Sequence, residues 1–387
     1  MGLELMKLGL RVERQTTVPD GEAVRDAIKE SIERADVLIV TGGLGPTSDD
    51  LTREATAEAM GIELMEDEHA RRCVEEFFEK LGREMPESNL KQALIPCGAE
   101  VLPNPNGTAP GVYVPPRLGQ GEPCAVFLLP GPPNELYPMY HAEVPHRLRA
   151  LADLATDYSM CELRFTGVGE SSFHEKLDAK LHAIEGLEVG YCARPSEVDL
   201  RLMGAAESIE SAKSVVLSEF NEQLVSDDGR SIEQVVVDQL IEKNMKLALA
   251  ESCTGGLISS RVTDVSGASQ IFTHGFITYA NEAKRDVLGV YQALLDTHGA
   301  VSQEVAEAMA EGALKVSGSD LALSVTGVAG PSGGTDEKPV GTVWLALAAK
   351  GQVTQSVKAF YPRDRATIKA MVSQKALDMI RKALAGF

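Results

Sequence analysis

The sequence lacks the features of a membrane-spanning, secreted or fibrous protein. None of its 387 residues lies in a run of 18 or more apolar residues, which excludes an ordinary spanning helix. The N-terminal stretch carries a carboxylate, Glu4, and no small-residue cleavage site, so it does not resemble a signal peptide. Aromatic residues make up only 5%, but the 44% of hydrophobic and 24% of charged residues are typical of a globular protein. We therefore expect a cytoplasmic protein of two or three domains.

Paired cysteines and basic residues are also scarce. The six cysteines lie far apart and include no Cys-x-x-Cys pair. In a chain of this length we expect them to be reduced thiols. Lys and Arg number 37 against 57 Asp and Glu, which gives a net charge of −20. Because an acidic surface repels phosphate backbones, we expect no nucleic-acid partner, and the absence of long apolar runs predicts no membrane partner.

The charge is distributed unevenly along the chain. Residues 1–230 carry 41 Asp and Glu against 22 Lys and Arg, whereas residues 231–387 carry 16 against 15. The two parts must have different surfaces, which favours a domain boundary near residue 230. The nearly neutral second part can still gather a small anion with a few local cations.

The first segment alternates between helical and extended patterns. A helix is predicted from Glu22 to about Arg34, with Asp20 as its cap. Two short apolar runs, 36–40 and 125–129, are typical of strands buried in a parallel sheet. The first run ends in a glycine loop that precedes a new helix near Leu51. This is the doubly wound pattern, in which ligands bind at the carboxyl ends of strands.

The rest of the chain contains two further regions. Residues 158–228 include a half-exposed strand over 197–203 and form a small α+β linker domain without evident chemistry. The α/β pattern resumes with a helix over 232–243, a strand over 247–250, a helix from about Leu257, and strands over 321–325 and 342–348. The predicted fold class is α/β, with two doubly wound α/β domains joined by the small α+β domain. The predicted boundaries are 1–157, 158–228 and 229–387.

Ser252 stands where a predicted strand leads into a helix. One interpretation makes it a helix N-cap. The other makes it a nucleophile, because Gly255 and Gly256 let a ligand approach the backbone and helix amides can hold an oxyanion. The nearby histidines suggest no triad, so its base would be a lysine such as Lys284, five residues after Tyr279. The alternative is that Lys284 is a solvated side chain on a polar helix.

The segment 327–341 holds five glycines and two prolines between two predicted strands. It is either a long surface turn or a functional loop whose amides suit a phosphate or a carboxylate. Arg363 and Arg365 follow shortly afterwards and can supply the countercharge.

A second glycine loop follows the predicted strand 36–40. Gly42, Gly43 and Gly45 can cradle a phosphate there, and Asp49 and Asp50 can hold a divalent metal. The alternative is a helix N-terminus at which the helix dipole favours acidic residues.

Taken together, these segments resemble the CinA family of competence/damage-inducible proteins. The likeness is to the two-part form, which has an N-terminal domain similar to molybdopterin-binding proteins and a C-terminal nicotinamide mononucleotide (NMN) amidohydrolase domain. It extends over nearly the whole chain. The segments that carry it are 41–50, 103–111, 129–135, 250–256 and 326–343.

The resemblance implies hydrolysis of the NMN carboxamide to nicotinate mononucleotide and ammonia. It implies that Ser252 is the nucleophile, with Tyr279 and Lys284 as its activating partners, and that Thr326 contacts the substrate or the oxyanion. It also implies a small-molecule nucleotide substrate, no metal or cofactor for this reaction, and a homodimer. The substrate-binding residues implied are Thr254, Gly255, Gly256, Thr326, Gly327, Gly330 and Arg365, with Arg363 as an alternative to Arg365.

For the N-terminal domain the resemblance implies a metal-dependent ADP-ribose pyrophosphatase. Its nucleotide pocket would contain Gly42, Gly43 and Gly45, and its divalent metal would be held by Asp49 and Asp50. Family members usually begin with a strand before the first helix. This chain opens inside what resembles that helix, so we expect either that the start is misassigned or that the first strand is missing. Three hypotheses follow: an amidohydrolase, a pyrophosphatase with an accessory C-terminal domain, and a non-catalytic module that binds a pterin or a nucleotide.

Overall fold

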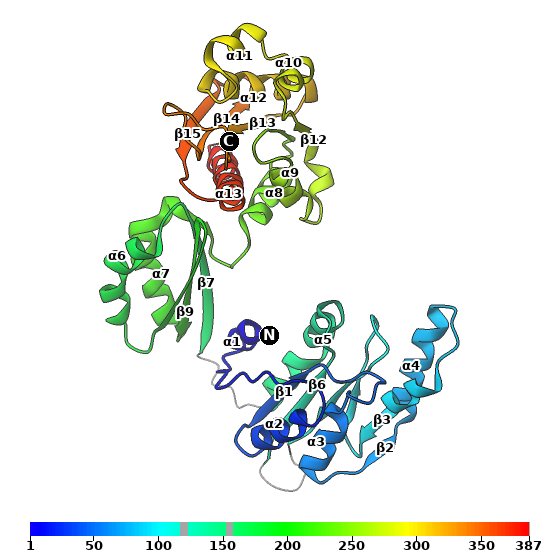
Figure 1. Ribbon diagram of the computed structural model, residues 1–387. Helices are drawn as coiled ribbons and strands as arrows, with labels where there is room; N and C mark the ends of the chain where they lie inside the picture. Colours follow the sequence, from blue (N-terminus) through cyan, green and yellow to red (C-terminus); the bar gives the residue numbers. More distant parts are fainter. Residues whose placement is uncertain (117–122, 152–157, 387) are drawn as a thin grey trace. The chain divides into compact units, whose positions relative to one another are not determined.

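The computed structural model describes residues 1–116, 123–151 and 158–386. The chain divides into two compact units, Met1–Thr156 and Asp157–Phe387. Figure 1 shows the elements of each unit, and both units are of mixed α/β structure, as the sequence predicted. No described helix is long and apolar enough to cross a membrane. All six cysteines are free thiols, as expected.

The first unit is built around a four-stranded sheet of order β1-β6-β5-β4. Only β1 and β6 are parallel, and the other two pairs are antiparallel. Strands β2 and β3 form a separate two-stranded antiparallel sheet. The elements are α1 (Gly2–Lys7), α2 (Ala23–Ile32), β1 (Val37–Thr41), α3 (Thr52–Met60), β2 (Leu64–Glu66), α4 (Glu68–Lys80), the 3-10 turn η1 (Glu87–Ala93), β3 (Leu94–Pro96), β4 (Glu100–Leu102), β5 (Gly111–Val114), β6 (Ala125–Leu129) and α5 (Pro133–Leu151).

Two sequence predictions for this unit need correction. The residue that precedes α2 is Glu22, and within the described part of the chain no side chain caps this helix. Gly21, which has a positive φ, separates Asp20 from Glu22. The strand β1 is only partly buried, since it lies at the edge of its sheet, whereas β6 is central and fully buried.

The second unit begins with a four-stranded antiparallel sheet of order β10-β7-β9-β8. Helices α6 and α7 pack on this sheet through an apolar core that includes Phe165, Phe173 and Phe220. The elements are β7 (Ser159–Thr166), α6 (Glu170–His182), β8 (Glu188–Arg194), β9 (Glu197–Gly204), α7 (Ala206–Phe220), η2 (Asn221–Gln223) and β10 (Leu224–Ser226).

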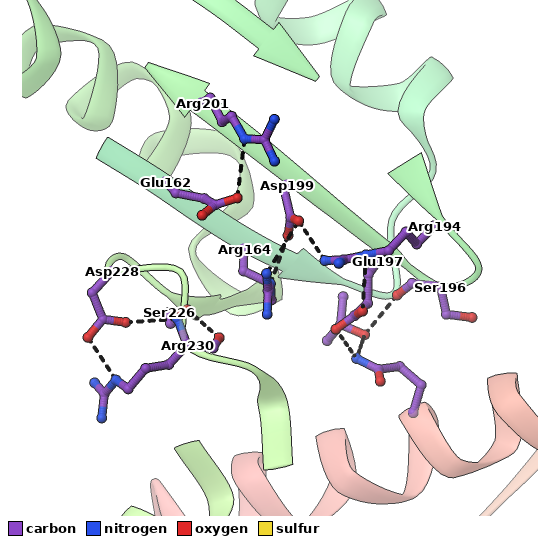
Figure 2. A network of polar contacts seen from close by, with 12 residues as sticks. Glu162, Arg164, Arg194, Ser196, Glu197, Asp199, Arg201, Ser226, Asp228 and Arg230 are labelled. Atoms are coloured by element: carbon purple, nitrogen blue, oxygen red, sulfur yellow. Dashed lines mark hydrogen bonds and ion pairs between the residues drawn. The ribbon is translucent and has the colours of Figure 1, made fainter. Parts of the chain in front are cut away.

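The strand predicted as half-exposed, β9, is mostly buried. Its polar residue Asp199 is only 1% exposed, because it accepts hydrogen bonds from Arg164 on β7 and from Arg194 on β8 (Figure 2). Arg201 pairs with Glu162 in the same way. The alternating polar residues therefore face charged partners on neighbouring strands, which a single strand's pattern does not reveal.

The remainder of the second unit is a five-stranded mixed sheet of order β12-β11-β13-β14-β15. Strands β12, β11 and β13 are parallel, and β14 and β15 are antiparallel to their neighbours. The elements are α8 (Ile232–Glu242), β11 (Leu247–Glu251), α9 (Leu257–Thr263), η3 (Ala268–Gln270), β12 (Phe272–Ile277), α10 (Asn281–Leu288), α11 (Gln292–His298), α12 (Gln303–Ser317), β13 (Leu321–Gly327), β14 (Thr342–Ala349), β15 (Gln355–Phe360) and α13 (Arg365–Leu384).

Helices cover both faces of this sheet (Figure 1). Because side chains alternate along a strand, Leu247 and Leu249 pack with α8, α9 and α13, while Ala248 and Ala250 pack with α10, α11 and α12. The sheet is thus the middle layer of three.

The last helix, α13, also contacts the antiparallel sheet of the same unit. Gln374 donates to the Thr166 hydroxyl and to the Glu197 carboxylate, and the Arg381 guanidinium donates to the carbonyls of Leu224 and Glu222. This single helix therefore links the two sheets of the second unit.

Candidate active site

The carboxyl ends of three parallel strands place the candidate residues together. Glu251 at the end of β11 lies in register with Ile277 of β12 and Val325 of β13. Ser252 follows the first of these positions directly, and Thr326 follows the third. Because parallel strands end at the same edge of a sheet, residues more than 70 positions apart in the sequence meet there.

A cavity of about 190 Å³ opens at this edge. Six of the residues predicted from the sequence line this cavity. Cys253, Asn281 and three small apolar residues, which were not predicted, line it as well. A larger, shallower hollow of about 470 Å³ beside α12 and β14 has no serine, cysteine or histidine on its wall. The cavity at the strand ends is lined by Ser252, Cys253, Tyr279, Asn281, Lys284, Ala300, Val301, Thr326, Gly327, Ala329 and Arg365.

Lys284 Nζ lies 3.2 Å from Ser252 Oγ. The same nitrogen donates to the carbonyls of Thr278, at 2.8 Å, and Tyr279, at 3.2 Å. Lys284 is 1% exposed and Ser252 is 8% exposed, so this is a buried contact and not the solvated lysine of the alternative interpretation. Among the described residues, no carboxylate lies within ion-pair distance of the ammonium.

Burial lowers the pKa of Lys284 below its ordinary value of 10.5, although the nearby Cys253 thiol opposes this shift. The geometry also determines where the lone pair of the neutral amine points. The two carbonyls can only accept, so the two N–H groups of a neutral amine go to them. Ser252 is the one partner that can donate, and its hydroxyl proton therefore faces the lone pair of Nζ.

The helix after Ser252 is capped by Glu251, not by Ser252. Helix α9 begins only at Leu257, and the Glu251 carboxylate accepts hydrogen bonds from the amides of Gly256, Ile258 and Ser259 and from the Ser259 hydroxyl. The N-cap interpretation of Ser252 is therefore wrong. The expectation that these helix amides face a ligand beside Ser252 is also wrong, because a buried carboxylate occupies them.

Four of the predicted substrate-binding residues do not line the cavity. Thr254 is fully buried, and its hydroxyl has no hydrogen-bond partner among the described residues. Gly255 and Gly256 form the left-handed turn that leads to α9. Gly330 contributes its carbonyl, which accepts a hydrogen bond from Arg365 Nη1 at 2.9 Å.

Tyr279 and Arg365 form one side of the cavity together. Arg365 Nη2 donates to the Tyr279 hydroxyl at 3.0 Å, and Tyr279 is 59% exposed. The phenol thus contacts the arginine, whereas the backbone carbonyl of Tyr279 contacts Lys284. Of the two candidate arginines, Arg365 lies on the cavity wall and Arg363 does not.

The Thr326 hydroxyl donates its proton to the Ala300 carbonyl at 2.7 Å. With its proton engaged, this oxygen can accept a hydrogen bond but cannot donate one to an oxyanion. Of the two roles that the resemblance implied, the geometry therefore favours contact with a donor group of the substrate.

The sequence reasoning missed several cavity residues, and only some of them have a sequence feature that could have identified them. Asn281 lies three residues before Lys284 on α10, so helical spacing could have placed both on one face. Ala300, Val301 and Ala329 carry no chemical signature. Cys253 is adjacent to Ser252, but burial raises the pKa of its thiol to about 12, so it is not a thiolate nucleophile at neutral pH.

In the glycine loop of the first unit, two of the three predicted glycines adopt left-handed conformations, and Gly45 does not. Gly42 and Gly43 both have positive φ, and a side chain at Gly43 would collide with Thr52. Asp50 is held by the amide and hydroxyl of Thr47. Burial tends to raise the pKa of Asp50, but these hydrogen bonds, the Gly45 amide and the charge of Lys91 together lower it.

The residues around Asp49 and Asp50 do not form a preorganised metal site. Both carboxylates lie within hydrogen-bond distance of the Thr47 hydroxyl, and the ammonium of Lys91 donates to the carbonyls of Thr47 and Asp50. Among the described residues, no group of three His, Cys, Asp or Glu side chains could hold a metal ion. The pyrophosphatase activity stays a prediction.

Three family profiles match the chain. Residues 3–150 match a probable molybdopterin binding domain, residues 162–226 match the damage-inducible protein CinA KH domain, and residues 229–384 match the CinA C-terminal domain.

Individual proteins match over different lengths. A CinA-like protein of Akkermansia muciniphila is 48% identical over 97% of this chain and 90% of its own length. A putative competence-damage inducible protein of Caldicellulosiruptor bescii is 44% identical over 98% and 93%. Among solved structures, a competence/damage inducible protein of Agrobacterium tumefaciens is 39% identical over 40% of this chain and 97% of its own, with a TM-score of 0.38.

Proposed function

This chain belongs to the CinA family, and from that premise we propose that it is an amidohydrolase that converts nicotinamide mononucleotide to nicotinate mononucleotide and ammonia. The observation that carries the proposal is the buried hydrogen bond between Lys284 Nζ and Ser252 Oγ at the wall of a cavity. A serine with a neutral lysine as its base is a recognised variant of the nucleophile–base pair.

The reaction begins with the neutral amine of Lys284. The amine takes the Ser252 proton as Oγ attacks the carboxamide carbon, which gives a tetrahedral intermediate. The Lys284 ammonium then protonates the leaving nitrogen, and ammonia departs as the C–N bond breaks. Water, deprotonated by the same amine, attacks the acyl ester and releases the carboxylate, and Ser252 recovers its proton.

The other cavity residues orient the substrate. The Thr326 oxygen accepts a hydrogen bond from the carboxamide NH₂, because its own proton is committed to the Ala300 carbonyl. The Thr278 and Tyr279 carbonyls keep the Lys284 amine directed at Ser252. These contacts hold the reacting groups close before the bond-making step, which lowers its entropic cost.

The test is ammonia release from NMN by the purified full chain without added metal. Ser252→Ala should abolish the release, while Ser260→Ala, an exposed serine on α9, should leave it unchanged. If the Ser252→Ala protein is folded and turns over NMN at nearly the normal rate, the nucleophile assignment is wrong.

A further inference from the structure

Three cations gather where α13 begins, beside the cavity. Arg363, Arg365 and Lys369 have no carboxylate within ion-pair distance among the described residues, although the chain as a whole carries a net charge of −20. The nearest acidic residue in the sequence, Asp364, is committed to the helix, because it accepts hydrogen bonds from the Ala366 and Thr367 amides and from the Thr367 hydroxyl. The positive charges are therefore not neutralised by a described carboxylate, and Arg365 keeps further N–H donors besides those that it gives to Gly330 and Tyr279.

Lys369 lies one helical turn after Arg365, so both side chains project from the same face of α13. Its Nζ faces the turn after Ser252. A Cβ added at Gly255 would have this nitrogen at 3.9 Å and, chain neighbours aside, no other heavy atom of the described residues within 4 Å. Lys369 is partly buried. The space over Gly255 is thus open and has an ammonium on one side.

The size of the cavity indicates what must lie in that space. Pockets that enclose a whole drug-sized ligand usually measure about 300–1,000 Å³. This cavity measures about 190 Å³, so it encloses the reacting end of a nucleotide and leaves the remainder outside. Arg365 belongs to the cavity wall, and Lys369 lies one turn further along the helix toward Gly255.

Three amides at the start of α9 do not supply an anion site. The amides of Gly256, Ile258 and Ser259, at the start of α9, are occupied by the Glu251 carboxylate. The cationic side chains beside this turn remain as groups that can recognise an anion near Ser252. A phosphate monoester carries about −1.5 to −2 charges near neutral pH and suits both a guanidinium and an ammonium.

We propose that Lys369, together with Arg365, binds the phosphate of the nucleotide substrate over Gly255. This inference rests on the proposed function, because it assumes that the carboxamide enters the cavity of Ser252. In this role Lys369 determines specificity, because it strengthens the binding of the phosphorylated substrate but not the binding of the corresponding nucleoside.

The test compares NMN with nicotinamide riboside, which lacks the phosphate, in the full chain. Lys369→Gln should raise the KM for NMN roughly tenfold or more, the loss expected for a hydrogen bond to a charged group, with kcat within about twofold. The KM for the riboside should not change. Lys369→Arg should restore most of the NMN affinity, and Arg363→Gln, which removes one charge outside the cavity, should have little effect on either substrate.

Two results would overturn the proposal. One is an equal rise in KM for both substrates with Lys369→Gln, which would show that the lysine does not recognise phosphate. The other is a rise in the KM for NMN with Arg363→Gln as large as that with Lys369→Gln. This would show that the positive charge of the region attracts the nucleotide and that Lys369 forms no specific contact.

A binding measurement separates this inference from the proposed function. Calorimetry with Ser252→Ala protein should show that NMN binds more tightly than the riboside, that inorganic phosphate competes with NMN, and that Lys369→Gln removes the difference. If the unmodified chain turns over neither compound, the amidohydrolase proposal fails, but this pattern would still support the phosphate site. If NMN and riboside bind equally, or NMN does not bind, the phosphate site is wrong.

Discussion

Lys284 Nζ lies 3.2 Å from Ser252 Oγ, and its two other hydrogen-bond partners are backbone carbonyls. This set of partners suits the neutral amine, because two N–H groups serve two carbonyls and the lone pair remains for the serine proton. It suits the ammonium less well, because these three neutral oxygens can accept its N–H groups, but among the described residues no carboxylate balances its buried charge.

The rate of ammonia release should rise with pH. The base is active only when Lys284 is neutral, and burial lowers the pKa of Lys284 below 10.5. We expect kcat to follow a single ascending limb with an apparent pKa below that value. The measurement is kcat for NMN across pH, and a rate that falls through the same range would contradict the assignment of Lys284 as the base.

The same shift predicts a change in stability with pH. The unfolded chain holds the lysine proton up to about its ordinary pKa, while the folded chain releases it at a lower pH. Between the two values the unfolded state binds more protons, so the free energy of unfolding should rise with pH. In Lys284→Met protein this contribution should be missing, which urea denaturation at several pH values would measure.

Replacing Lys284 by arginine should abolish turnover. The guanidinium stays charged at every pH that the protein tolerates, so it cannot accept the Ser252 proton. Lys243→Arg, at the exposed end of α8, is the matched control and should be as active as the unmodified chain. An active Lys284→Arg protein would remove Lys284 from the role of base.

Glu251→Gln should lower both stability and turnover. The carboxylate accepts four hydrogen bonds at the start of α9, and an amide would place an NH₂ group against backbone N–H donors. We expect a loss of about 1–3 kcal/mol in the free energy of unfolding, the cost of a buried group left unpaired. Glu242→Gln, exposed at the end of α8, should change neither quantity, and an equal effect of both substitutions would argue against a specific role for Glu251.

A fragment of residues 229–387 should fold and keep NMN amidohydrolase activity. The described residues that line the cavity all lie from Ser252 to Arg365, inside the fragment. Its stability should be lower than that of the second unit, because Arg381 and Gln374 would lose their partners on the antiparallel sheet. The measurement is ammonia release per folded molecule, and a soluble, folded but inactive fragment would show that residues before 229 complete the site.

Patterns within a single segment predicted much of the fold. The apolar run 125–129 coincides with β6 at both ends, and the buried character of β11 and β13 followed from their continuous apolar sequences. Asp199 shows where this reasoning fails. Its exposure depends on two arginines from other strands, and no periodicity within 197–203 records them.

The candidate site, like the fold, was predictable from the sequence only in part. Ser252 was recognised because it follows a strand, and Lys284 became specific only through the resemblance, since the fold alone brings it to Ser252 across 32 positions. The role of Glu251 was missed for a different reason. A buried acidic residue beside a nucleophile has the same sequence signature as an exposed one, and its four donors lie five to eight residues further along the chain.

The helix α13 contacts the cavity with one part and the antiparallel sheet with another, and the angle about the helix axis between these two sets of side chains must stay fixed. Arg365 at its first turn contacts the cavity, and Gln374 and Arg381 further along contact the antiparallel sheet. One residue inserted between Lys369 and Gln374 would rotate everything beyond it by about 100°. Such an insertion would leave the cavity residues in place and turn the later contacts away from their partners, so length changes in this helix should be far less tolerated during the divergence of these proteins than substitutions along its exposed side.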